Sequence, residues 1–153
     1  MLERVPGDRL DYKPHEKSMP LGRLAQHLSE LPGWGVMMLS TDEFDYAPEG
    51  GAPYTPPAIK SVGQLVEAFD KGVSEMRAAL QSASDETMLK PWSLKATGKA
   101  VFTMPKAAVL RSMIMNHMIH HRAQLGVYLR MNGVAIPGVY GPSADDMAAG
   151  AGQ

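Results

Sequence analysis

The sequence predicts an all-α protein folded as a single bundle of helices. Three stretches carry apolar residues at helical spacing, in residues 21–31, 62–80 and 106–131. The connections between them are long and rich in proline and glycine, and one short stretch, residues 90–104, alternates apolar and polar residues. Three sizeable helices joined in this way favour a helical bundle, and a length of 153 residues suits one domain.

The first long helix is predicted to begin near Ser18. Prolines and a glycine within residues 1–17 exclude one continuous helix there, so this N-terminal segment is expected to be irregular. Ser18 can serve as the N-cap, with Pro20 in the first turn. Pro32 is expected to kink or end the helix, which residues 34–40 could continue for a turn or two.

The second long helix has the clearest start signal. Residues 42–58 contain four prolines and two glycines, which predicts a loop without regular structure. Ser61 and Gln64 then form an S-x-x-Q capping box. The helix that follows carries an apolar face made of Val62, Leu65, Val66, Phe69, Val73, Met76 and Leu80.

The third long helix follows the alternating stretch, for which two interpretations are open. That stretch is either a short hairpin around Ala96–Thr97–Gly98 or an irregular connection. Pro105 is the expected first-turn residue of a helix over residues 106–131, and Asn132–Gly133 supplies its stop. Residues 147–153 are expected to form a disordered tail.

The composition excludes several classes of protein. The formal net charge of −1 argues against general nucleic-acid binding, and the scattered basic residues argue against a membrane-binding patch. No apolar run approaches the ~20 residues that span a bilayer, and the charged N-terminus lacks the apolar core of a signal peptide. The absence of cysteine excludes disulfides and cysteine-containing zinc sites. We therefore expect a cytoplasmic protein in which any metal is held by His, Asp or Glu.

Three of the five histidines lie within five residues of the third helix. On a helical wheel His117 and His121 fall one turn apart in the middle of the apolar face, whereas His120 lies to the side. The other residues of that face are Leu110, Met113, Ile114, Gln124, Leu125 and Tyr128. Two buried imidazoles on successive turns are costly without partners, and a single metal ion satisfies both.

His27 supplies a third candidate ligand. Leu24 and Leu31 flank it at helical spacing, which places its ring on the apolar stripe of the first helix. Three inward histidines from two helices make a three-nitrogen site with open positions, the catalytic type of metal centre. The alternative is a structural bundle whose histidines are satisfied by hydrogen bonds. Met118 follows His117, so the Glu of an H-E-x-x-H motif is missing and a metalloprotease is disfavoured.

Three further residues are candidates for a substrate pocket beside the histidines. Gln124 and Tyr128 share the histidine face one and two turns beyond His121, and His120 could line an entrance. The simpler interpretation is that Gln124 and Tyr128 bond to the backbone and that His120 is exposed. No catalytic residue beyond the ligands is identified, and the two tryptophans are interpreted as packing residues.

Three motifs resemble a known family. "SMPLGRLAQHLSELPGW", "KPWSLK…GK" and "NHMIHHRAQLGVYLRMNGVAIPGVYGPSADD" resemble the DinB/YfiT-like superfamily of metal-dependent enzymes, over about Leu10 to Asp146. The resemblance implies a DinB-like four-helix bundle of the up-down-down-up type. It also implies that His27, His117 and His121 bind a divalent metal, zinc or nickel first, with iron or manganese as alternatives.

The resemblance has consequences for function as well. Known activities of the superfamily are similar to thiol-dependent transfer and isomerisation. We therefore expect a metal-dependent transferase or hydrolase-like enzyme that acts on a small molecule, with a low-molecular-weight thiol as a candidate partner. The alternative is a non-catalytic bundle that holds a metal or a small molecule as a sensor or carrier.

One departure from the superfamily concerns the N-terminus. Members usually have a full first helix ahead of the segment that corresponds to residues 3–14, whereas here residues 1–6 match only the end of such a helix. A truncated first helix would leave apolar faces of the other helices uncovered. We expect a homodimer to cover them, with exchange of elements as one way to do so.

Overall fold

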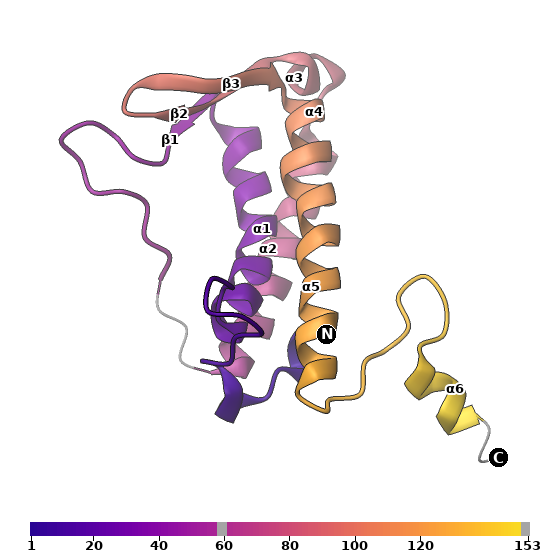
Figure 1. Cartoon of the computed structure of the whole chain (residues 1–153). Coiled ribbons are helices and arrows are strands. Elements are labelled where there is room, and N and C mark those ends of the chain that lie inside the picture. The colour runs from indigo at the N-terminus through magenta and orange to yellow at the C-terminus, as the bar shows by residue number, and fades with distance from the viewer. Residues whose placement is uncertain (58–60, 151–153) are drawn as a thin grey trace.

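The computed structural model describes residues 1–57 and 61–150, and helices dominate it (Figure 1). Three long helices lie side by side: α1 (Leu21–Ser40), α2 (Val62–Ser82) and a last helix that ends as α5 (His117–Met131). α1 is central, because it packs against both of the others. A small sheet covers one end of the three helices (Figure 1). The predicted helical bundle with a short hairpin before the last helix is confirmed.

The N-terminal residues form no long helix. They make two short 3₁₀ turns, η1 (Leu2–Arg4) and η2 (Gly7–Arg9), which pack against the bundle through the buried Val5. None of the helices in the described part of the chain has the length and hydropathy that a membrane span requires.

α1 runs without interruption through Pro32. Pro20 takes the N-cap position and no side chain caps the helix, so the predicted N-cap at Ser18 is wrong. The helix also continues past Pro32 to Ser40. This matches the prediction that residues 34–40 could extend it, and not the prediction that it ends at Pro32. α2 packs closely at this point: a Cβ atom on Gly72 would lie 3.2 Å from Pro32 Cβ and 3.3 Å from the Gly33 nitrogen. The two helices therefore touch at backbone level where α1 lacks an N–H.

α2 begins at the predicted cap. Ser61 Oγ accepts a hydrogen bond from the backbone N–H of Gln64 at 3.3 Å. Of the predicted apolar face, Leu65 is buried and most of the remainder is half-buried, whereas Leu80 is 42% exposed. The face is only partly covered because α2 packs mainly on α1.

The sheet has three strands in the order β1-β2-β3. β2 (Pro91–Ala96) and β3 (Lys99–Pro105) form an antiparallel hairpin, the first of the two predicted alternatives. Thr97 and Gly98 both have positive φ, at 51° and 75°, as the two central residues of a type I′ hairpin turn require. β1 (Glu43–Asp45) pairs in parallel with β2. The prediction that this segment has no regular structure is therefore wrong for these three residues, which are ordered by the neighbouring strand.

The last helix changes its winding along its length. It begins as α4 (Lys106–Val109), continues as a π-helical segment η3 (Leu110–Asn116) and becomes α5 at His117. The predicted start and the predicted stop are both confirmed, with Gly133 at φ 71° after the final turn. The π-helical segment was not predicted, and it lies directly before the first histidine of the cluster.

A buried lysine joins the last helix to the end of α1. Lys106 Nζ donates to the carbonyl oxygens of Leu39 and Thr41, at 3.0 and 2.6 Å. Asp42 Oδ1 lies 3.4 Å away. The ammonium therefore occupies the C-terminal end of α1, where the helix dipole favours positive charge. A short helix that was not predicted, α3 (Asp85–Leu89), leads into β2.

The core has two parts along the bundle. The first lies between the long helices and is formed by Val5, Leu21, Leu24, Ala25, Leu28, Leu31, Leu65, Leu125, Tyr128 and Leu129. The second lies between the sheet and the helix ends and is formed by Met38, Trp92, Val109, Leu110 and Ile114.

The C-terminal tail carries a short helix, α6 (Ala144–Gly150). This differs from the disorder expected from residue 147 onward, and residues 151–153 lie outside the described part of the chain. Arg130 on α5 holds the start of α6 through two hydrogen bonds to the carboxylate of Asp145, at 2.9 and 2.6 Å. Asp145 Oδ2 also accepts from the backbone N–H of Ile136 at 2.9 Å, so one carboxylate ties the tail to the bundle.

Candidate metal centre

Three histidine rings meet between α1 and the last helix. His27 on α1 is buried, and His117 and His121, one turn apart on α5, are partly buried. One ligand nitrogen from each lies within 4.8 Å of the other two, and His27 Nε2 is 3.1 Å from His117 Nε2. The ring centroids are 4.6, 4.7 and 4.9 Å apart. The structure thus brings together the three residues that the sequence singled out.

The outer nitrogens of the two α5 histidines face hydrogen-bond acceptors. His117 Nδ1 lies 3.1 Å from the Met113 carbonyl oxygen, and His121 Nδ1 lies 2.6 Å from Gln124 Oε1. Each contact requires a proton on Nδ1, which leaves the lone pair of a neutral ring on Nε2. Outer hydrogen bonds of this kind orient metal-binding histidines in proteins.

The change of winding at the end of the π-helical segment explains the contact of His117 with Met113. In an α-helix the backbone N–H of residue 117 would donate to the carbonyl of residue 113. Here that N–H donates to the Ile114 carbonyl instead. The Met113 oxygen does not receive the α-helical hydrogen bond from residue 117 and faces the His117 ring instead. π-helical segments within α-helices recur at functional sites, and the end of this one leaves the Met113 carbonyl facing a candidate ligand.

His27 lacks a matching outer partner. Its Nδ1 is buried without a hydrogen bond, and the nearest charge is Glu30 Oε2 at 3.9 Å. If a neutral His27 ring carries its proton on Nδ1, two Nε2 lone pairs face each other 3.1 Å apart. If the proton is on Nε2, it can donate to His117, but the bare Nδ1 then faces the carboxylate. A cation between the Nε2 atoms removes the conflict, because both lone pairs then bind it while Nδ1–H points to Glu30.

The electrostatic environment keeps the α5 rings neutral. Burial lowers the pKa of His117 and outweighs its hydrogen bond to Met113, and the nearby His27 and His120 rings lower it further. Burial also lowers the pKa of His121, in spite of the hydrogen bond to Gln124. Neutral imidazole is the form that binds metal, so both rings are ready to act as ligands at neutral pH.

Glu30 is an ionised carboxylate beside the cluster. Burial acts to raise its pKa, but the His27 ring, the Gln26 amide and the Arg23 guanidinium together outweigh burial and hold the pKa below its usual value. Gln26 Nε2 donates to Glu30 Oε1 at 2.7 Å. Arg23 lies 3.4 Å from the other oxygen. The carboxylate is thereby held beside His27, where it supplies negative charge behind the ring.

The donor set suits a divalent transition metal. Two nitrogens that each lie about 2.1 Å from a tetrahedral zinc are ~3.4 Å apart, close to the 3.1 Å between the Nε2 atoms of His27 and His117. The widest pair of ligand atoms, within 4.8 Å, has to close further to share the same ion. Three neutral nitrogens leave a coordination position for solvent or substrate, and imidazole suits zinc, nickel and iron.

The residues predicted to line a pocket divide into two groups. Gln124 and His120 lie beside the cluster: Gln124 contacts His121 as described, and the exposed His120 ring is 4.8 Å from the His121 ring between centroids. Tyr128 does not join them. It is buried in the core, and its hydroxyl donates to the Met19 carbonyl at 3.1 Å, which is the bond to the backbone that the simpler interpretation expected.

Sequence reasoning missed two neighbours of the histidines. Trp34 was interpreted as a packing residue, yet its ring lies 5.1 Å from the His27 ring and 6.3 Å from the His117 ring between centroids. Glu30 was not considered. Both carried a usable signal, because Glu30 follows His27 by three residues and Trp34 follows it by seven, so that both share its face of the helix.

The fold and the site together define a class of protein, a small helical bundle with a three-histidine cluster between its central and last helices. The chain belongs to the DinB family, whose sequence profile matches residues 1–153. The uncharacterized protein YrdA of Bacillus subtilis is similar, with 26% identity over 149 residues that cover 97% of this chain and 82% of YrdA.

Two crystal structures of DinB-like proteins share the fold. The first, YjoA from Bacillus subtilis, has a TM-score of 0.65 and 20% identity, over 93% of this chain and 88% of that chain. The second, from Bacillus cereus, has a TM-score of 0.65 and 23% identity, over 92% of this chain and 86% of that chain. At these identities the structural likeness establishes the fold alone.

Proposed function

We propose that this protein is a metal-dependent enzyme that acts on a small molecule, with His27, His117 and His121 as the metal ligands. The observation that carries the proposal is the 3.1 Å approach of two Nε2 atoms from different helices. The Nδ1 sides of His117 and His121 are fixed by acceptors, so the ligand lone pairs point inward. The DinB family resemblance implies the same three ligands.

The ligand set determines what the site can do. A divalent metal bound there would act as a Lewis acid and would lower the pKa of a coordinated water or thiol. Three neutral imidazoles would not reduce the double positive charge of the metal, and that charge favours the lowered pKa of the coordinated group. The chain's own part is to orient the rings: the Met113 carbonyl and Gln124 hold two of them, and Glu30 stands behind the third. Zinc or nickel suits the nitrogen donors best.

For the reaction we propose transfer or hydrolysis, with a low-molecular-weight thiol as the candidate second substrate. The family resemblance supports the thiol, because a thiolate is a strong nucleophile once a metal has lowered its pKa. The chain has no cysteine of its own, so a thiol nucleophile would have to come from the substrate.

Metal analysis of protein purified without a histidine tag tests the proposal. We expect about one equivalent of divalent metal in the wild-type protein and loss of that metal in His121→Ala. His120→Ala is the matched control, because it removes the exposed neighbouring imidazole and should leave the metal in place. The proposal is wrong if the wild-type protein takes up no stoichiometric metal, or if both variants retain it equally.

A second candidate is a non-catalytic bundle that holds a metal or small molecule as a sensor or carrier. It is favoured by the state of Glu30, which holds Gln26 and faces His27, so that it orients a ring instead of accepting a proton from a substrate. Turnover assays of the metal-loaded protein with thiols and electrophiles distinguish the two candidates, since only the enzyme consumes them catalytically.

We also propose that the protein is a homodimer. The last helix exposes large apolar side chains, and a second copy of the chain is the partner that would cover them. Those side chains are Met115, Ile119, Val127 and Met131.

A further inference from the structure

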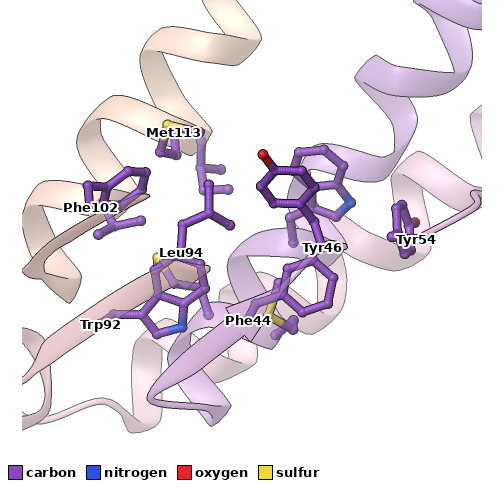
Figure 2. Close-up of a pocket in the computed structure, with 12 residues that line it drawn as sticks. Phe44, Tyr46, Tyr54, Trp92, Leu94, Phe102 and Met113 are labelled. Carbon is purple, nitrogen blue, oxygen red and sulfur yellow. The ribbon is translucent and has the colours of Figure 1, made fainter. Parts of the chain in front are cut away.

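An apolar cavity of about 180 Å³ lies between the sheet and the ends of the long helices. Figure 2 shows its wall, in which Trp92, Phe44 and Phe102 gather around Leu94. The lining side chains come from α1, all three strands, the last helix and the segment after β1. Because these elements are far apart in the chain, the cavity is formed by tertiary packing and not by one element. The lining side chains are all aliphatic, aromatic or methionine.

The cavity wall offers no free polar group to a ligand on the side of Trp92, because Trp92 Nε1 donates to Thr41 Oγ1 at 3.1 Å. Its outer rim is different. Tyr46 and Tyr54 are each 44% exposed, and the backbone N–H of Tyr54 donates to the Tyr46 carbonyl at 2.9 Å. The two tyrosines form a rim at the surface, and the interior behind them is apolar.

We propose that this cavity binds an apolar group about the size of one aromatic ring. An apolar protein cavity of roughly 150 Å³ binds benzene, so this space is large enough for a ring and too small for two. The aromatic walls favour a ring further through edge-to-face contacts. They already make such contacts with one another, between Trp34 and Tyr54 and between Phe44 and Tyr54.

The cavity lies against the histidine cluster. Trp34 lines the cavity and also contacts the His27 and His117 rings. Met113 lines the cavity with its side chain, and its carbonyl faces His117 Nδ1. The ligand class that uses both places is a small molecule with one aromatic or compact aliphatic group and a short polar end. That this molecule is the substrate rests on the proposed function, whereas binding of the apolar group does not.

The chain's two tryptophans both line the cavity, which provides a direct measurement. Iodobenzene is a ring of the right size, and its iodine quenches indole fluorescence at contact. We expect saturable quenching of the wild-type protein by iodobenzene. Iodide in solution serves as the comparison and should leave the buried Trp92 unquenched. Absence of saturable quenching up to the solubility limit of iodobenzene would overturn the inference.

A pair of variants locates the binding. Leu94→Phe extends a ring into the cavity and should weaken iodobenzene binding about tenfold or more, which corresponds to ~1.4 kcal/mol. Val101→Phe makes the same kind of change at a β3 position that is 57% exposed and should bind like wild type. Equal affinities of the two folded variants would contradict the inference. If Leu94→Phe does not fold, a competition experiment with the wild-type protein takes its place. Pyridine is a polar ring of the same size, and it should not displace iodobenzene from the apolar cavity.

Failure of this inference and failure of the proposed function are separable. Iodobenzene should bind equally to the wild-type protein, to protein treated with a chelator and to His121→Ala. Binding without any metal uptake would support the cavity and remove the metal centre. Metal uptake without iodobenzene binding would do the opposite.

Discussion

At the scale of single residues, neither tautomer of a neutral His27 ring gives both of its nitrogens a suitable partner. His27 carries the conflict, since one of its nitrogens faces another imidazole and the other faces Glu30. A buried polar atom without a hydrogen bond is rare in folded proteins and needs an explanation. The sequence placed three imidazoles on inward faces. It could not place their nitrogens, because ring orientation depends on the Met113 carbonyl and on Gln124.

A second residue-scale feature predicts a pH dependence. Arg130 lowers the pKa of Asp145 to about 2, and the N–H of Ile136 contributes. A folded-state pKa below the unfolded value gives stability that is present above the unfolded value and lost as the pH falls. We therefore expect the melting temperature of wild-type protein to drop more between pH 5 and pH 2 than that of Asp145→Asn, in buffers matched for ionic strength.

Asp70→Asn is the control for that measurement, because Asp70 is an exposed aspartate on α2 far along the chain from the tail. It should follow the wild-type curve. If Asp145→Asn follows the same curve, the carboxylate does not hold the tail to α5 in solution.

At the scale of elements, local sequence signals predicted most starts and stops, with the N-cap of α1 as the exception, but they did not predict the winding of the last helix. The Ser61 cap, the Asn132–Gly133 stop and the hairpin turn are each encoded by a few adjacent residues. The π-helical segment before His117 has no such local signal, because residues 110–116 carry the same apolar helical spacing as the rest of the helix. β1 was missed because its pairing partner lies about 50 residues later in the chain.

The contact between α1 and α2 gives a prediction about helix packing. A methyl group on Gly72 would press on Pro32 and on the Gly33 backbone, which are both rigid. Overpacking costs typically 1–3 kcal/mol and helix propensity returns about 1, so Gly72→Ala should lower the free energy of unfolding by roughly 1 kcal/mol. Urea denaturation followed by circular dichroism measures it.

The same helix offers a matched control. A Cβ atom on Gly63 would meet only Ser61 Oγ at 3.9 Å, which is ordinary contact. Gly63→Ala should therefore leave stability unchanged or raise it by up to ~1 kcal/mol. The close approach of the two helices would be refuted by a gain in stability of equal size in both variants.

At the scale of the whole molecule, three long helices cannot cover one another completely. α1 is enclosed, but the outer side of the last helix is open: Met115, Ile119, Val127 and Met131 are 51, 39, 58 and 56% exposed. An uncovered apolar face of this kind is the premise of the homodimer expected from the sequence. Its spatial form could not be predicted, because which residues stay uncovered depends on the changed winding before His117.

The proposed homodimer is tested by its mass in solution. Sedimentation equilibrium at micromolar concentration should give twice the chain mass of 16.6 kDa. The double variant Ile119→Glu and Val127→Glu should sediment as a monomer, because it places charges in the apolar contact. Val101→Glu, at a position that is 57% exposed on β3, should remain dimeric. A wild-type protein that sediments as a monomer rules the dimer out.

The position of the histidines along the chain has a further result. His27 and His117 are 90 residues apart, yet their nitrogens almost touch. An ion bound by His27 and His117 would act as a cross-link that closes most of the polypeptide into one loop, as a disulfide does in proteins that have cysteine. Binding of the ion and resistance to unfolding would then be coupled, so that the chain without an ion would be the less stable form.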